Sequence, residues 1–189
     1  MLERMARAAL VAVVGDARLK PNDPRIDIAR DVGRRLVDEG CRVLTGGLGG
    51  VMEAASAGAH ESQRYVPGCV IGLLPGHDPA AANPHVDVAI PTRLDLARNT
   101  IVAHADAVIA VGGGSGTLSE IALAWQFHRL IVALRVAGWS GELADRRIDD
   151  RVRYPDLPED RVYGAGDAQE AVQLLIEWLP RYQRRHRGV

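Results

Sequence analysis

The sequence predicts a Rossmann-like α/β fold: a doubly wound, mostly parallel sheet of about seven strands, with helices on both faces. Three observations predict it. The apolar runs are short and continuous, as in strands covered on both faces. Helical patterns separate these runs, which favours parallel strands joined by crossover helices. The 189 residues are 47% hydrophobic and 25% charged, as in an ordinary globular protein. We expect residues 1–189 to form one domain, with a basic tail at 181–189.

Strands are expected where a short apolar run ends in a loop. Five runs qualify: Ala8–Val14, Cys41–Thr45, Cys69–Leu74, Asp106–Val111 and Leu130–Leu134. Two shorter candidates are Val86–Ile90 and Arg161–Tyr163. The first run follows two arginines, as in a signal peptide, but it is short and the polar turn Gly15–Arg18 comes directly after it. We therefore interpret it as the first strand.

Helices are expected between the strands. The first begins at Pro24 behind the capping residue Asp23 and ends before Gly40. Three more are Val51–Gln63, Thr92–His104 and Thr117–His128, and a capping box, Asp167-x-x-Glu170, opens the last. The helix expected over Thr92–His104 has four apolar residues on one face: Leu94, Ala97, Ile101 and Ala105.

Two segments of the expected fold are less regular. Thr117–His128 is apolar nearly all round, which predicts either a core helix or a subunit interface containing Trp125 and Phe127. Ala137–Asp160 is rich in Arg, Asp and Pro, and we interpret it as an insertion of helix and loop.

Charge and cysteine usage exclude several functional classes. The net charge is −1, from 23 basic and 24 acidic residues, so the chain as a whole offers no electrostatic case for nucleic acid or a membrane surface. No apolar stretch approaches the length of a membrane span. The basic tail is expected to be solvated. Cys41 and Cys69 lack metal-ligand spacing and are interpreted as buried free thiols in a reducing compartment, the cytoplasm.

Two glycine clusters, Thr45–Gly50 and Gly112–Thr117, lie between an expected strand and an expected helix. Ligands of open parallel sheets bind beyond the carboxyl ends of the strands. Glycine lets the backbone approach a ligand, and the following helix offers free N–H groups. One such loop would fit a simple tight turn equally well, but two side by side predict a phosphate site. Its expected contacts are Gly46, Gly47, Gly49, Gly50, Gly113, Gly114, Ser115, Gly116 and Thr117.

Several known site motifs are missing from the sequence. Neither glycine cluster is followed by the lysine of a P-loop, and neither reads as the G-x-G-x-x-G of dinucleotide-binding proteins. There is no G-x-S-x-G elbow of a serine hydrolase. The pair His85-x-Asp87 is a weak metal signal, and we expect no metal site.

Two charged residues have both a structural and a functional interpretation. Glu120 follows Thr117 by three residues, so the pair could form a capping box, or Glu120 could be a carboxylate at the rim of the phosphate site. Arg98 could form a salt bridge with Asp95, or it could pair with a phosphate or orient a carboxylate. The residue pattern leaves both alternatives open.

The segment Gly113–Glu120 resembles the Gly-Gly-x-Gly-Thr-x-x-Glu signature of the Lonely Guy proteins, which are Rossmann-like phosphoribohydrolases of the SLOG superfamily. Leu44–Met52 and Leu96–Asn99 resemble that family's other glycine loop and its arginine segment. Val111–Gly114 and Ala137–Trp139 are more similar to a sister branch that is related to carriers of the molybdenum cofactor.

The resemblance implies Arg98 and Glu120 as a catalytic pair that releases a free base from a nucleoside 5′-monophosphate without a cofactor. It also implies an alternative, a non-catalytic carrier of a nucleotide or of the molybdenum cofactor. Asn99 stands where the enzymes have a second basic residue, which leaves the substrate open. A homodimer or larger assembly is expected by resemblance. Some relatives bear a lysine decarboxylase label, but Lys20, the single lysine, lies in a loop after the first strand, so that activity is not expected.

Overall fold

The computed structural model describes residues 7–182 and contains a seven-stranded sheet in which every pair of neighbouring strands is parallel. The strand order is β4-β3-β2-β1-β5-β6-β7. The strands are β1 (Leu10–Gly15), β2 (Arg42–Thr45), β3 (Val70–Leu74), β4 (Val88–Pro91), β5 (Ala107–Val111), β6 (Leu130–Leu134) and β7 (Tyr163–Ala165). The predicted doubly wound fold is confirmed.

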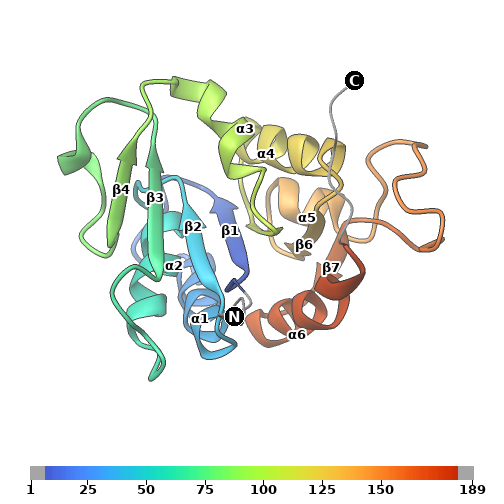
Figure 1. The fold of residues 1–189 in the computed structure, drawn as a ribbon, viewed down its shortest axis with the longest axis horizontal. Helices are drawn as coiled ribbons and strands as arrows, with labels where there is room; N and C mark the ends of the chain where they lie inside the picture. The colour runs from blue at the N-terminus through green and yellow to red at the C-terminus, as the bar shows by residue number, and fades with distance from the viewer. Residues whose placement is uncertain (1–6, 183–189) are drawn as a thin grey trace, which may run out of the picture.

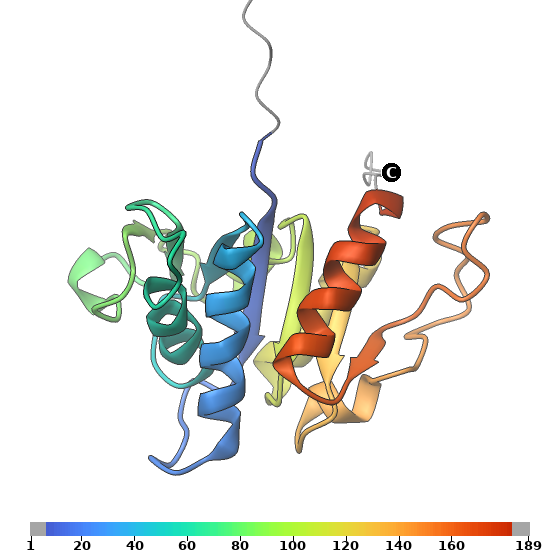
Figure 2. The same ribbon diagram turned by 90° about the horizontal axis from the view of Figure 1, so that it is seen from below.

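Helices cover both faces of this sheet (Figure 1). On one face lie α1 (Pro24–Asp38), α2 (Val51–His60) and α6 (Ala168–Trp178), which Figure 2 shows in front of the strands. On the other lie α3 (Asn99–Val102), α4 (Ser115–Gln126) and α5 (Trp139–Leu143). The chain turns from one half of the sheet to the other between β1 and β5, so the loops after these two strands diverge and leave room for a ligand.

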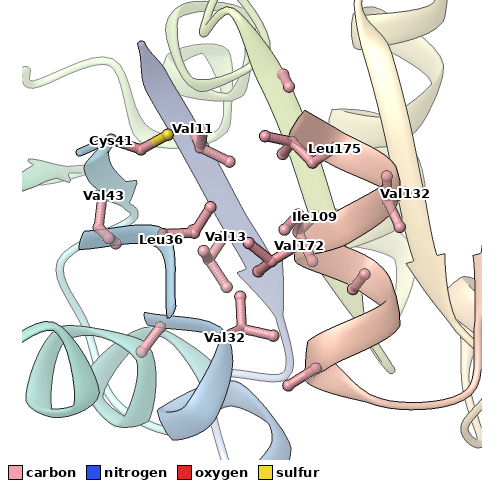
Figure 3. Packing of buried hydrophobic residues seen from close by; sticks show 14 of the residues in the cluster. Val11, Val13, Val32, Leu36, Cys41, Val43, Ile109, Val132, Val172 and Leu175 are labelled. Carbon is pink, nitrogen blue, oxygen red and sulfur yellow. The ribbon is translucent and has the colours of Figure 1, made fainter. Parts of the chain in front are cut away.

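The core explains why the apolar runs are continuous. Every residue of β5 and of β6 is buried, because helices pack on both sides of these central strands. Figure 3 shows one layer, in which Val13 and Ile109 of the sheet meet Val32 of α1 and Val172 of α6. Cys41 and Cys69 are buried free thiols, as predicted, and burial raises the pKa of Cys41 to about 11.

The predicted caps are present with one difference. The side chain of Asp23 accepts a hydrogen bond from the Arg25 backbone N–H at the start of α1, and Gly40 takes a positive φ of 77° just beyond its end. Asp167 caps α6 through the Glu170 N–H at 2.8 Å. Glu170 reaches back to the N–H of Gly166 instead of Asp167, so the capping box is only half formed.

The prediction of one amphipathic helix over Thr92–His104 is wrong. The segment forms a short 3-10 helix, Asp95–Arg98, followed by the four-residue α3. Positive φ values of 58° at Arg93 and 47° at Asp95 prevent a continuous helix. The expected apolar stripe is not a buried face, because Leu94 and Ile101 are exposed.

The helix α4 is buried on one face only. Ile121, Ala124 and Trp125 pack into the core, whereas Gln126 is exposed. Trp125 is 1% exposed and therefore lies inside the chain, not on an interface. Of the predicted alternatives, the core helix describes this residue.

The insertion after β6 is the predicted short helix, α5, followed by a loop. A buried guanidinium anchors this loop: Arg153 pairs with Asp160 and donates hydrogen bonds to the carbonyl oxygens of Trp125 and Arg129. The loop thereby satisfies carbonyl groups at the end of α4. The basic tail lies outside the described residues from residue 183 onward. Among residues 7–182, no helix is long and apolar enough to cross a membrane.

Candidate functional site

A cavity of about 290 Å³ opens at the carboxyl ends of β1, β2 and β5, where the strand order turns. Three loops and one short helix form its walls. They are the turn after β1, the two glycine loops, and the segment Leu96–Asn99. The predicted residues that line it are Gly46, Arg98, Gly114, Ser115, Gly116, Thr117 and Glu120. The fold therefore brings most of the sequence-predicted site together.

The start of α4 offers hydrogen-bond donors to this cavity. The helix begins at Ser115, and the Leu118 N–H bonds to the carbonyl of Gly114. Within residues 7–182, no acceptor is bonded to the N–H groups of Ser115, Gly116 or Thr117. Three free amides at the positive end of a helix dipole form a suitable anion site.

The amide of Gly113 is already used inside the protein. Its N–H donates to Asp16 Oδ2 at 2.7 Å, and the residue is not among those lining the cavity. Its φ of 97° and its closeness to Thr117 explain why glycine is needed there. Its predicted role as a direct ligand contact finds no support in this geometry, because its donor is taken.

The first glycine loop contributes mainly shape. Gly46 lies beneath the Arg98 guanidinium, and a Cβ at this position would come within 2.5 Å of Nη1. Gly47 packs against Leu74, and a Cβ on Gly50 would meet the backbone oxygen of Asp16. Gly47, Gly49 and Gly50 are outside the lining of the cavity. The loop therefore makes room for Arg98 and lets α2 begin close to β1.

Arg98 and Glu120 face each other in the cavity, with Nη1 and Oε1 separated by 3.7 Å. The alternatives left open by the sequence are now decided in part. The helix α4 begins two residues before Thr117, so Thr117 is not its N-cap and no capping box forms with Glu120. Within the described part of the chain, the ion pair of Arg98 is with Glu120 rather than Asp95.

Both side chains of this pair are largely shielded from water, and this burial disfavours the charged form of each. Burial raises the pKa of Glu120 to about 7, against the attraction of Arg98, which lowers it. Burial also lowers the pKa of Arg98, against the attraction of Glu120 and Asp95. Nη1 of Arg98 is buried without a hydrogen-bond partner among residues 7–182. A carboxyl group near its half-ionised point beside an unsatisfied guanidinium is typical of a functional site.

Sequence reasoning missed the role of Asp16. This residue lines the cavity from the turn after β1, and its Oδ2 accepts hydrogen bonds from the Gly113 N–H and from Arg25 Nη1, both at 2.7 Å. Arg25 is itself held by Asp23, at the start of α1. A lone aspartate in the turn Gly15–Arg18 carries no recognisable motif, so only its neighbours in space reveal its role.

The insertion also supports the site, which the sequence did not indicate. Ser140 Oγ in α5 accepts from the Gly112 N–H at 2.7 Å and donates to the Leu134 carbonyl. The backbone N–H groups of Trp139 and Ser140 donate to the carbonyls of Gly113 and Gly112. The second glycine loop is thus fixed by the turn after β1 on one side and by α5 on the other.

The weaker metal signal has a structural explanation. Asp87 accepts hydrogen bonds from the Tyr65 hydroxyl and from the backbone N–H groups of Gly68 and Val70, which hold the start of β3. His85 lies on the wall of a separate, smaller cavity between α1 and α2. Within residues 7–182, no group of three or more His, Cys, Asp or Glu side chains is arranged to hold a metal ion.

Comparison with known proteins places this site in context. The model of the SLOG cluster4 family matches residues 8–160. The cytokinin riboside 5′-monophosphate phosphoribohydrolase LOG of Oryza sativa subsp. japonica is 29% identical over 167 residues, covering 83% of this chain and 68% of that protein.

Two solved structures are similar over nearly their whole length. The molybdenum cofactor binding protein of Rippkaea orientalis is 32% identical, with a TM-score of 0.73 over 91% of this chain and 98% of that one. The molybdenum cofactor carrier protein of Chlamydomonas reinhardtii is 27% identical, with a TM-score of 0.72 over 91% of this chain and 99% of that one.

Proposed function

Because the chain belongs to the SLOG cluster4 family, we propose that its cavity binds a nucleoside 5′-monophosphate and that the protein hydrolyses the N-glycosidic bond to release the free base. One observation carries this proposal. A buried carboxyl group, Glu120, has a pKa raised to about 7 and lies 3.7 Å from Arg98, in the cavity that also receives the free amides of α4.

The phosphate is assigned to the start of α4. The N–H groups of Ser115, Gly116 and Thr117 are free there, and the helix dipole favours a negative group. Gly114 and Gly116 have open space where a side chain would lie, so nothing in the described protein obstructs a ligand at that point.

The chemistry assigned to the pair follows from its charges. When the bond between C1′ of the ribose and the base nitrogen breaks, the electron pair leaves with the base and the ribose becomes positive. Ionised Glu120 stabilises this charge and accepts a proton from the water that attacks C1′, whose OH group bonds to C1′. The departing base nitrogen takes one proton from solvent, and Glu120 then returns its proton to solvent, so the net reaction consumes one water. Arg98 favours the ionised form of Glu120 and keeps its side chain in place. The products are the free base and ribose 5-phosphate.

One difference from the enzymes is relevant to the substrate. Asn99 replaces their second basic residue, and here its Nδ2 donates to Ser119 Oγ at 2.8 Å, which braces the start of α4. Arg98 is then the cation that lines the cavity. We infer that phosphate binding depends more on backbone amides than on side-chain charge.

Base release from a panel of nucleoside 5′-monophosphates tests the proposal. We expect wild-type protein to release free base and Glu120→Ala to lose at least 100-fold in kcat, because general-base and charge stabilisation are both removed. Glu53→Ala, which removes a carboxylate of α2 outside the cavity lining, should retain activity. Equal rates for wild type and Glu120→Ala would contradict the assignment.

A second candidate is a carrier that binds its ligand without turnover. The likeness to the two structures described as molybdenum cofactor proteins supports it. That cofactor carries a phosphate, which the amides of α4 would hold, while the protein offers no metal-ligand cluster among residues 7–182. A ligand that raises the melting temperature of both wild type and Glu120→Ala, with no base released by either, would favour this function.

We also propose that the protein works as a homodimer or larger assembly. Five exposed apolar side chains lie on or beside one end of the sheet: Val88, Ile90, Leu94, Leu96 and Ile101. Val88 and Ile90 pair in register with Ile71 and Leu73, so they point to the sheet face that carries α3 and α4. We call these five residues the apolar edge. Exposed apolar side chains gathered at one end of a sheet are typical of interfaces.

A further inference from the structure

Asp16 occupies the point where both glycine loops meet the central strand. Its backbone oxygen accepts a hydrogen bond from the Val51 N–H at 2.9 Å, at the end of the first loop. Its Oδ2 accepts from the Gly113 N–H at 2.7 Å, in the second loop. The side chain therefore has a defined orientation at the base of the cavity that it lines.

The contacts of Asp16 match a negatively charged carboxylate. Arg25 Nη1 lies 2.7 Å from Oδ2, and the Arg25 guanidinium is held in turn by two further bonds to Asp23. Both groups that bond to Oδ2 are donors. Within residues 7–182, no hydrogen bond to Oδ1 is formed, so the carboxylate of this cavity-lining residue keeps one free acceptor oxygen.

This free acceptor differs from most of the cavity's other polar groups. The amides of α4 and the guanidinium of Arg98 are donors, suited to a phosphate. A carboxylate repels a phosphate but binds hydroxyl groups strongly, because a hydrogen bond to a charged acceptor is about twice as strong as a neutral one. The free oxygen of Asp16 is therefore better suited to a hydroxyl-bearing part of a ligand than to its phosphate.

The kinds of groups that line the cavity match the parts of a nucleotide. The lining of the cavity includes Ser115–Thr117, whose free amides suit a phosphate, and the apolar side chains of Leu48, Met52 and Leu96, which suit a base. A nucleoside monophosphate carries its ribose between phosphate and base. Resting on the proposed function, we propose that Asp16 Oδ1 accepts hydrogen bonds from the vicinal hydroxyls of the ribose and thereby selects ribonucleotides over deoxynucleotides.

Binding of adenosine 5′-monophosphate and of its 2′,3′-dideoxy analogue, compared by calorimetry, tests this proposal. We expect wild-type protein to bind the ribonucleotide at least tenfold more tightly. Binding is compared instead of turnover because removing the 2′-hydroxyl itself changes the lability of the glycosidic bond. Equal affinities in the wild type would overturn the proposal, as would failure to bind either nucleotide.

The variant Asp16→Asn separates recognition from support of the loop. Its amide oxygen still accepts from Gly113 and Arg25, so its NH₂ group replaces Oδ1 in the cavity. We expect the affinity for the ribonucleotide to fall to within threefold of that for the dideoxy analogue, which should bind as before. A variant that keeps the tenfold preference would overturn the assignment.

Ser140→Ala is the matched control, since it loosens the same loop from α5 without touching the cavity lining. This variant should weaken the binding of both nucleotides by the same factor, so the ratio of the two affinities should stay unchanged. Base release, measured on the same proteins, distinguishes the two proposals. A tenfold preference without base release would leave the role of Asp16 standing and reject the hydrolase, whereas base release with equal affinities would reject the role of Asp16 alone.

Discussion

Glu120 shows how one residue can serve a site at the expense of the fold. It is 7% exposed, and its nearest cation, Arg98, does not form a hydrogen bond with it at 3.7 Å. Burial therefore outweighs the attraction of Arg98 and raises the pKa of Glu120 to about 7. The residue is half ionised near neutral pH, where a general base is most effective.

The stability of the protein should report this raised pKa. An unfolded glutamate ionises around pH 4.5, so the contribution of Glu120 to the stability of wild-type protein falls as pH rises from there through about 7. The full loss is about 3 kcal/mol, from 1.36 kcal/mol per pKa unit. Glu120→Gln cannot ionise and should gain stability over wild type progressively across this window. Urea unfolding at pH 5 and pH 8 measures the difference.

The control for this experiment is Glu177→Gln, which alters an exposed carboxylate on α6. Its stability relative to wild type should be nearly the same at both pH values. If Glu120→Gln also showed a constant difference, the buried carboxyl would not be the group that titrates.

At the scale of elements, the start of α4 combines glycines with opposite purposes. Gly113 has a φ of 97° and would place a Cβ 2.3 Å from the Thr117 Cβ, so its conformation and packing both exclude a side chain. Gly116 lies within the helix, and a Cβ there would meet nothing within 4 Å. The missing side chain of Gly116 leaves space for a ligand. The fold itself does not require glycine at this position.

Alanine substitutions should separate these two purposes. The free energy of unfolding of Gly116→Ala should be about 0.5–1 kcal/mol higher than that of wild type, because alanine favours a helix more than glycine does. The variant should therefore unfold at a slightly higher urea concentration. The same variant should bind adenosine 5′-monophosphate more weakly, because the methyl group lies beside the free amides. Gly113→Ala should instead lose about 1–3 kcal/mol of stability through backbone strain. Unchanged nucleotide affinity in Gly116→Ala would contradict the placement of the phosphate at the start of α4.

At the scale of the whole molecule, the sheet is covered unevenly. Helices bury both faces of β5 and β6, whereas β4 at one end exposes Val88 and Ile90 on the side of α3 and α4. Leu96 of the apolar edge also lines the ligand cavity and is 74% exposed. A second copy that covered this edge would lie next to the site.

Sedimentation at micromolar concentration tests this assembly. We expect wild-type protein to be a dimer or larger, because association would bury the apolar edge. Ile101→Asp should shift it towards monomer by placing a charge in the interface. Ile176→Asp, on the exposed side of α6, should leave the mass unchanged. A wild-type monomer would contradict the proposal.

Local sequence patterns predict the layers of the fold, which the structure confirms, and the main residues of the candidate site. Continuous apolar runs can only be buried on both faces, so they predict parallel strands under helices. The two glycine loops fell at strand ends, where ligands of such sheets bind. The family resemblance, not the residue pattern alone, implied Arg98 and Glu120 as a pair, and the fold brings them to one cavity.

Tertiary structure decided what depends on residues far apart in the chain. The hydrogen bond from Gly113 to Asp16 joins residues 97 positions apart in the sequence, and that from Gly112 to Ser140 joins residues 28 apart. No local sequence pattern therefore reveals these two contacts. The break in the helix expected over Thr92–His104 follows from positive φ values at Arg93 and Asp95, where side-chain periodicity alone favours a helix. The pKa of Glu120 is likewise a tertiary property, because burial of a carboxyl exists only after β1, β5 and α4 have packed together.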